Sequence, residues 1–185
     1  ENSRLWREYY NGGLAYLEFN VSHAKQIYQA ITESVCAEAK LKAYALSDWG
    51  EALLVVSTDE NIGIAGELAK NSLGYGVLDS HICKSFFVLS RVNAYYGQWE
   101  QSIDFLNRAI DFFERNGDLI GLISAYIEKK LVFANCGLWR EYFTADQVAQ
   151  TILDTIHPEP LSLKATLLGG WARAQALAGR FAECE

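Results

Sequence analysis

Residues 84–118 decide the fold of this chain, and they read KSFFVLSRVNAYYGQWEQSIDFLNRAIDFFERNGD. In residues 99–113 the apolar side chains recur every three or four positions, which places them on one face of a helix. Residues 85–97 are apolar on several sides, as suits a helix packed between neighbours. Gly97 can reverse the chain between these segments, and Gly117 can end the second one in the left-handed conformation. The stretch therefore predicts a helical hairpin.

The turn of this hairpin recurs along the chain at a nearly constant spacing. A glycine is followed two residues later by an aromatic residue at three places, 40 and 42 residues apart: Gly97 with Trp99, Gly137 with Trp139, and Gly179 with Phe181. A period of this length indicates an array of similar structural units. We therefore predict hairpins at residues 3–35, 38–78, 80–117 and 119–157, and a truncated one at 161–185. Together they make one domain, residues 1–185, of the all-α class.

The segment 84–118 resembles a tetratricopeptide repeat (TPR), particularly the longer repeats of about 40 residues in bacterial regulatory proteins. The family pattern has a large and then a small residue in the first helix, a turn glycine, an aromatic residue, and three small or aromatic positions in the second helix. These positions are filled by Leu89, Ser90, Gly97, Trp99, Ser102, Leu106 and Ala109. The resemblance implies a right-handed α-solenoid of antiparallel helical hairpins.

The other hairpins match the pattern only in part. The matching residues are Gly12, Ala24 and Tyr28 in the first, Ala65, Ala69 and Ser72 in the second, Ala145, Ala149 and Ile152 in the fourth, and Trp171, Ala172, Gly179, Phe181 and Cys184 in the last. The first hairpin lacks the turn glycine, and the fourth needs a shift in register. These departures leave another kind of helical-hairpin solenoid open.

Composition excludes several partners. The chain has 16 Lys and Arg against 23 Asp and Glu, a formal net charge of −7, and phosphate binding needs clustered basic side chains, so we expect no direct nucleic-acid binding. No apolar run approaches the roughly 18 residues of a membrane span, so no membrane association is expected. The four cysteines form no C-x-x-C pair, which fits reduced thiols and a cytoplasmic location. Because the chain begins at Glu1 and ends inside a helical pattern, we expect a segment excised from a larger protein.

No motif for catalysis, nucleotides or metals stands out. The glycines between residues 63 and 76 form no phosphate-binding loop. His23, His81 and His157 lie far apart without a second ligand at helical spacing. There is no nucleophile signature such as G-x-S-x-G. We therefore expect no enzyme, no catalytic residues, no metal and no cofactor.

The TPR resemblance implies a concave groove, lined by the first helix of each repeat, that binds peptides or partner domains. The groove positions carried over from the family are Lys84, Phe87, Arg91, Tyr95, Ile127, Leu131, Asn135 and Arg173. Lys84 and Arg91 lie seven residues apart on one face, which suits an acidic partner or a free carboxylate. The alternative is that the side chains of Lys84 and Arg91 are simply solvated and bind no partner. Further candidate anchors, if exposed, are Trp6, Tyr9, Tyr10, Tyr16 and Trp49.

The favoured function is a non-catalytic protein–protein interaction module, acting as the sensor, effector or scaffold arm of a larger regulatory protein. Its partner would be a protein or peptide. The alternative is a helical-repeat domain that senses a small molecule inside the superhelix. The unpaired terminal helix of residues 161–185 also predicts a homodimer through that end, because open solenoid ends expose apolar faces.

Overall fold

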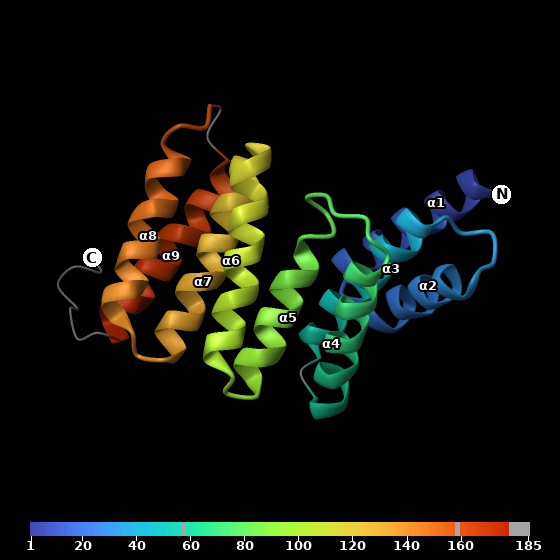
Figure 1. Ribbon diagram of the computed structural model, residues 1–185, viewed down its shortest axis with the longest axis horizontal. Helices are drawn as coiled ribbons and strands as arrows, with labels where there is room; N and C mark the ends of the chain where they lie inside the picture. Colours follow the sequence, from blue (N-terminus) through green and yellow to red (C-terminus); the bar gives the residue numbers. More distant parts are fainter. Residues whose placement is uncertain (57, 158–159, 178–185) are drawn as a thin grey trace. The chain divides into compact units, whose positions relative to one another are not determined.

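The computed structural model describes residues 1–56, 58–157 and 160–177, and every regular element in these ranges is an α-helix (Figure 1). The nine helices of these ranges are α1 (Asn2–Leu17), α2 (Val21–Glu33), α3 (Ala39–Val55), α4 (Asp59–Gly74), α5 (Lys84–Tyr95), α6 (Trp99–Asn116), α7 (Leu119–Asn135), α8 (Trp139–Leu153) and α9 (Leu161–Leu177). The all-α prediction is confirmed. None of these helices is both long enough and apolar enough to cross a membrane.

The chain divides into two compact units, Glu1–Gly97 and Gln98–Glu185. In the first unit α1 packs on α2 and α3 packs on α4, while α2 contacts α3 and α4 contacts α5. The first helices α1, α3 and α5 also contact one another in chain order. In the second unit α7 packs on α6 and α8, and α9 contacts both α7 and α8. The hairpins α1–α2 and α3–α4 are therefore present in the first unit and α7–α8 in the second. The predicted hairpin bounds and the single domain of residues 1–185 stay predictions.

Side-chain caps explain where several helices begin. The side chain of Asn20 accepts a hydrogen bond from the His23 amide at 3.2 Å and starts α2. Thr58 does the same for the Asn61 amide of α4, also at 3.2 Å. The side chain of Asp118 accepts a hydrogen bond from the Gly121 amide at 2.9 Å and starts α7. Each cap satisfies a backbone N–H that has no partner within its own helix.

The predicted turn glycines have the expected backbone conformation. Gly97 and Gly137 have φ values of 72° and 71°, which lie in the left-handed region that glycine enters at low cost. The third predicted turn, at Gly179 and Phe181, lies outside the described residues. In the first hairpin the equivalent position is held by Phe19, with φ 58°. A non-glycine residue there costs conformational energy, so this turn is strained.

Small residues let α2 pack closely on α1 and α4 on α3, as the repeat pattern predicts. The matched positions of α2, α4 and α6 are all at most 1% exposed: Ala24, Tyr28, Ala65, Ala69, Ser72, Ser102, Leu106 and Ala109. A Cβ placed on Gly12 would lie 2.8 Å from Cε1 of Tyr28, so only glycine lets this ring pack on α1. In the fourth hairpin Ala145 and Ala149 are buried, and Ile152 is half-buried and packs against the core cluster that contains Ala149 and Leu153.

Candidate functional site

The first helices of the first unit, α1, α3 and α5, lie next to one another and together line a depression of about 530 Å³. We call this depression the groove pocket. It is lined by Tyr10, Gly13, Leu14, Tyr16 and Leu17 of α1, Tyr28 of α2, Asp48 and Glu51 of α3, and Lys84 of α5. Side chains of four helices thus line one depression, although α1, α3 and α5 are separated by other elements in the sequence.

One wall of the groove pocket is apolar and strongly exposed. Tyr10, Leu14 and Leu17 follow one another at helical spacing on α1, and they are 63%, 58% and 73% exposed. Single exposed apolar side chains are ordinary, but three on one face of a helix form a patch that favours a binding surface. Each large apolar side chain stabilises a complex by about 1.5–3 kcal/mol when it is fully buried.

The floor of the groove pocket is formed by Tyr28, which reaches it past a glycine. Tyr28 is only 1% exposed, yet it lines the pocket. Its hydroxyl oxygen lies 4.0 Å from the point where a Cβ of Gly13 would stand. Because Gly13 has no side chain, the hydroxyl of Tyr28 faces the pocket and is not covered by α1.

Two carboxylates affect the pKa of two tyrosines that line the groove pocket, Tyr16 and Tyr28. Burial raises the pKa of both Tyr28 and Tyr16, and the negative charges of Asp48 and Glu51 raise it further. The positive charge of Arg91 opposes this shift at Tyr16. Both hydroxyls therefore stay protonated and remain able to donate a hydrogen bond over the whole physiological pH range.

Asp48 is already engaged in a local network. Its carboxylate accepts a hydrogen bond from the hydroxyl of Tyr9 at 2.5 Å and lies 2.8 Å from Nε2 of His81. The same Nε2 lies 3.1 Å from the Tyr9 hydroxyl, so the three groups form a closed triangle. The ring of His81 stacks on Tyr44 with centroids 4.2 Å apart. This triangle fastens the segment before α5 to α1 and α3.

Asp79 extends the network and fixes the same segment. Its carboxylate accepts hydrogen bonds from the Tyr44 hydroxyl at 2.6 Å and from the amides of His81 and Ile82 at 3.1 Å, and it pairs with Lys40 at 3.2 Å. Burial by itself raises the pKa of Asp79, but the hydrogen bonds from Tyr44, Ile82 and Lys40 together lower it below its ordinary value. This acid is therefore ionised in the folded chain.

The structure places the predicted groove residues of α5 as follows. Lys84 lines the groove pocket and is exposed. Arg91 is exposed and lies close enough to Tyr16 to affect its pKa, and Phe87 is half-buried. Tyr95 is 51% exposed, and its hydroxyl donates a hydrogen bond to the carboxylate of Asp59.

The predicted groove residues of the second unit have different surroundings. Leu131 is 46% exposed and Asn135 is exposed, so both are open to a partner. Ile127 is only 8% exposed and packs in the core with Leu153 and Leu167. Arg173 lies in the part of α9 whose side chains are not described.

The sequence did not indicate the α3 side of the site. Asp48 and Glu51 stand one helical turn apart on α3, but nothing local distinguishes them from solvated acidic residues. Among the aromatic candidates, Tyr10 is exposed, Tyr9 is buried, and Trp6, Tyr16 and Trp49 are half-buried. In the sequence, the cluster of aromatic residues in α1 was the feature that could have indicated this site.

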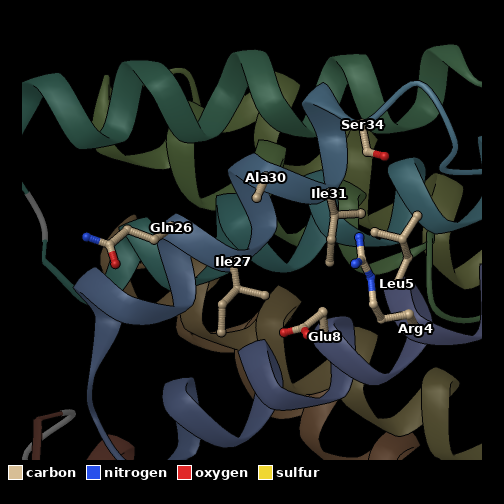
Figure 2. Close-up of a pocket in the computed structure, with 8 residues that line it drawn as sticks. All are labelled: Arg4, Leu5, Glu8, Gln26, Ile27, Ala30, Ile31 and Ser34. Atoms are coloured by element: carbon tan, nitrogen blue, oxygen red, sulfur yellow. The ribbon is translucent and has the colours of Figure 1, made fainter. Parts of the chain in front are cut away.

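A second depression, of about 400 Å³, lies between α1 and α2 (Figure 2). Figure 2 shows Ile27 and Ile31 extending from α2 toward α1, with Arg4 and Glu8 on the α1 side. Arg4 and Glu8 are exposed, and the apolar part of the lining comes from Leu5, Ile27, Ala30 and Ile31. Within the described ranges, no three His, Cys, Asp or Glu side chains gather in a way that could hold a metal ion.

Comparisons with known proteins bear on the fold. No family model and no curated protein matches the sequence. BtubC (BKLC) from P. vanneervenii has a similar structure, with a TM-score of 0.72 and 14% identity over 94% of this chain and 72% of that one. A protein of Podosopora anserina assigned as a kinesin light chain, with nearly identical TPR-like repeats, matches with a TM-score of 0.70 and 16% identity over 100% of this chain and 91% of that one. MamA of AMB-1 has a TM-score of 0.54 and 15% identity over 100% of this chain and 87% of that one.

These likenesses define the class of protein. The chain has a TPR-like helical-repeat structure, in agreement with the resemblance of residues 84–118. Repeat proteins of this kind form extended concave surfaces that can serve for binding, while the fold by itself does not fix a function.

Proposed function

We propose that this chain is a non-catalytic interaction module that binds a peptide or a partner domain along the surface formed by α1, α3 and α5. The observation that carries the proposal is the groove pocket, where the exposed apolar wall of α1 stands beside the charged side chains of α3 and α5. Binding interfaces combine apolar anchors with a polar rim in this way.

Lys84, Phe87, Arg91 and Tyr95 extend this surface along α5 in the proposal. Lys84 and Arg91 would attract an acidic side chain or a free carboxylate of the partner. Leu131 and Asn135 of α7 and Arg173 of α9 are the proposed contacts in the second unit. We further propose that the module serves as the sensor, effector or scaffold arm of a larger regulatory protein.

The test is selection of a displayed random-peptide library on the purified chain, followed by affinity measurement for the enriched peptides. We expect the double variant Tyr10→Ala/Leu14→Ala to lose most of the affinity without loss of stability, because both side chains are exposed. Tyr75→Ala is the matched control, since Tyr75 is 40% exposed at the end of α4 and lies outside the groove pocket. The proposal is wrong if neither that double variant nor Arg91→Ala/Tyr95→Ala weakens the binding of any enriched peptide.

We also propose that two copies associate through α9. Leu161 and Leu168 of this helix are 74% and 54% exposed, and burying them against a second copy would remove apolar surface from water. Light scattering at increasing concentration should show a dimer that Leu161→Lys/Leu168→Lys disrupts. A chain that stays monomeric at high concentration would contradict this proposal.

A further inference from the structure

The hydroxyl of Tyr28 faces the groove pocket, and no group of the described residues forms a hydrogen bond with it. Tyr28 as a whole is 1% exposed, but its hydroxyl is not among the fully buried polar atoms of the described residues. This hydroxyl is therefore available for a hydrogen bond with a group that enters the pocket. The glycine at position 13 keeps the way to it open.

Glu51 is the second available group. It is half-buried, and within the described ranges it has no hydrogen bond or ion pair to a protein group, whereas neighbouring Asp48 is held by Tyr9 and His81. A ligand that covered Glu51 with apolar atoms alone would remove its water and leave a carboxylate uncompensated, which is costly. A ligand that covers Glu51 therefore needs a positive group at this point.

The charges around the pocket differ from one point to another. At Tyr28 burial is the main effect on the pKa, and the carboxylates of Asp48 and Glu51 raise it further. At Tyr16 the positive charge of Arg91 opposes the same carboxylates. Lys84 is exposed and supplies a positive charge from α5. The surroundings of Tyr28 therefore favour a cation, and Lys84 favours an anion.

Building on the function proposed above, we infer that the groove pocket receives the side chain of a Lys or Arg residue of the bound peptide. The methylene stem lies along Leu14 and Leu17, as such stems do on apolar surfaces. The cation lies against the carboxylate of Glu51 and donates a hydrogen bond to the hydroxyl oxygen of Tyr28. An acidic residue beside it in the peptide pairs with Lys84. The occupant is a peptide with a basic residue next to an acidic one.

The experiment uses the same displayed library, selected in parallel on the wild-type chain and on two variants. Glu51→Gln removes the charge and keeps the shape of the side chain. Gly13→Leu fills the pocket, and its Cβ meets nothing closer than the Tyr28 hydroxyl at 4.0 Å. Tyr75→Ala, at a residue outside the groove pocket, is the control.

We expect peptides enriched on the wild type to carry Lys or Arg at one fixed position. Their affinity should fall on the order of tenfold or more with Glu51→Gln, because a charge-assisted hydrogen bond is lost. Gly13→Leu should abolish binding, and replacing the basic residue of the peptide by norleucine should have the effect of Glu51→Gln. Melting curves of the variants separate loss of binding from loss of folding.

Three other results are informative. Peptides that bind Glu51→Gln and the wild type equally would overturn the inference and leave the groove proposal standing. Enriched peptides with no basic residue at a fixed position would do the same. If no peptide is enriched above the blank support, the proposed function itself fails, and this inference fails with it.

Discussion

The first hairpin, α1–α2, and the fourth, α7–α8, share one turn geometry but hold their helices together in different ways. Phe19 and Gly137 occupy the same position of the turn, with φ values of 58° and 71°. In both turns the backbone amides of this residue and of the next one donate hydrogen bonds to carbonyl oxygens at the end of the first helix. The donor and acceptor residues are Phe19 and Tyr16, Asn20 and Ala15, Gly137 and Ala134, and Leu138 and Phe133, at distances of 2.9–3.1 Å. This pattern is a Schellman motif, so the two hairpins can be compared residue by residue.

With the turns aligned, Gly12 and Tyr28 of the first hairpin correspond to Lys130 and Asp146 of the fourth. The first pair is a small residue beneath a large ring. The second pair is an ion pair between an ammonium group that is 1% exposed and a carboxylate that is 14% exposed. One backbone arrangement therefore accepts either an apolar contact or a buried ion pair at its centre.

The ion pair of the fourth hairpin also forms polar contacts with the next helix, whereas Tyr28 shares an apolar core with Leu41 and Ala45 of α3. Nζ of Lys130 also lies 3.5 Å from the carbonyl oxygen of Leu167, and the hydroxyl of Tyr142 donates to the carbonyl of Gly170 at 2.7 Å. Both carbonyls belong to α9. The comparison teaches that the polar centre of the fourth hairpin positions the next helix, in addition to joining its own two.

The largest effect is expected from breaking the ion pair. Lys130→Ala leaves Asp146 without its partner in a largely buried place and should cost about 3–5 kcal/mol of unfolding free energy. Urea unfolding followed by circular dichroism measures this. The double variant Lys130→Met/Asp146→Leu removes both charges and should recover most of the loss. A double variant as unstable as the single one would show that the hydrogen bond to α9 matters more than the pair.

Adding a methyl group at Gly12, where the ring of Tyr28 packs on α1, should have the next largest effect on stability. Gly12→Ala places a Cβ 2.8 Å from the ring of Tyr28, and such overpacking costs about 1–3 kcal/mol. Gly13→Ala is the control, because its Cβ has room, and alanine is favoured over glycine in a helix by about 1 kcal/mol. The two neighbouring variants should therefore shift the melting temperature in opposite directions. A shift in the same direction would contradict the packing argument.

Exchanging the turn residues tests the strain at Phe19. Gly137→Ala should destabilise the chain by about 1–2 kcal/mol, because a side chain enters the left-handed region. Phe19→Gly should stabilise the chain by less than about 1 kcal/mol. The substitution removes the strain of the left-handed conformation, and this gain slightly exceeds the conformational entropy that a glycine loses on folding. Thermal unfolding of both variants measures the two signs. A destabilised Phe19→Gly would mean that the aromatic ring contributes to folding despite being 85% exposed.

The smallest effect is expected from the partly exposed ion pair of the first unit, and it appears only in acid. The pKa of Asp79 in the folded chain lies below its ordinary value of 3.8, so the folded state gains stability from this carboxylate above that pH. The gain is lost as the pH falls through the lower folded pKa. Melting curves between neutral and acidic pH should therefore show a shallower acid loss for Asp79→Asn than for the wild type. Parallel curves would contradict the role of this carboxylate.

Local sequence patterns were sufficient to predict the helices of this fold. The helical period, the glycines at residues 97, 117 and 137, and the small positions of the second helices predicted where helices lie and which faces are buried. These features depend on neighbours within a few residues, and backbone sterics enforce them directly. The strained turn at Phe19 could not be predicted in this way, because the left-handed conformation there follows from the packing of α1 on α2 and overrides the preference of the residue.

The site depended on contacts between distant parts of the chain. Lys84 was predicted as a groove residue from the repeat pattern, but its neighbours Glu51 and Tyr28 were not, because they come from other helices. The burial of Lys130 could not be predicted from the sequence either. A lysine is normally solvated and is buried only where a partner such as Asp146 forms an ion pair with it.

The sequence by itself therefore determined the helices, their turns and the succession of hairpins, because hydrophobic periodicity and glycine conformation act over short distances. Only the tertiary structure decided which charges meet. The packing of α1, α2, α3 and α5 placed the carboxylate of Glu51 and the hydroxyl of Tyr28 in one pocket, and the packing of α7, α8 and α9 enclosed an ion pair. Both results depend on electrostatics and desolvation, which are set by neighbours in space and not by neighbours in sequence.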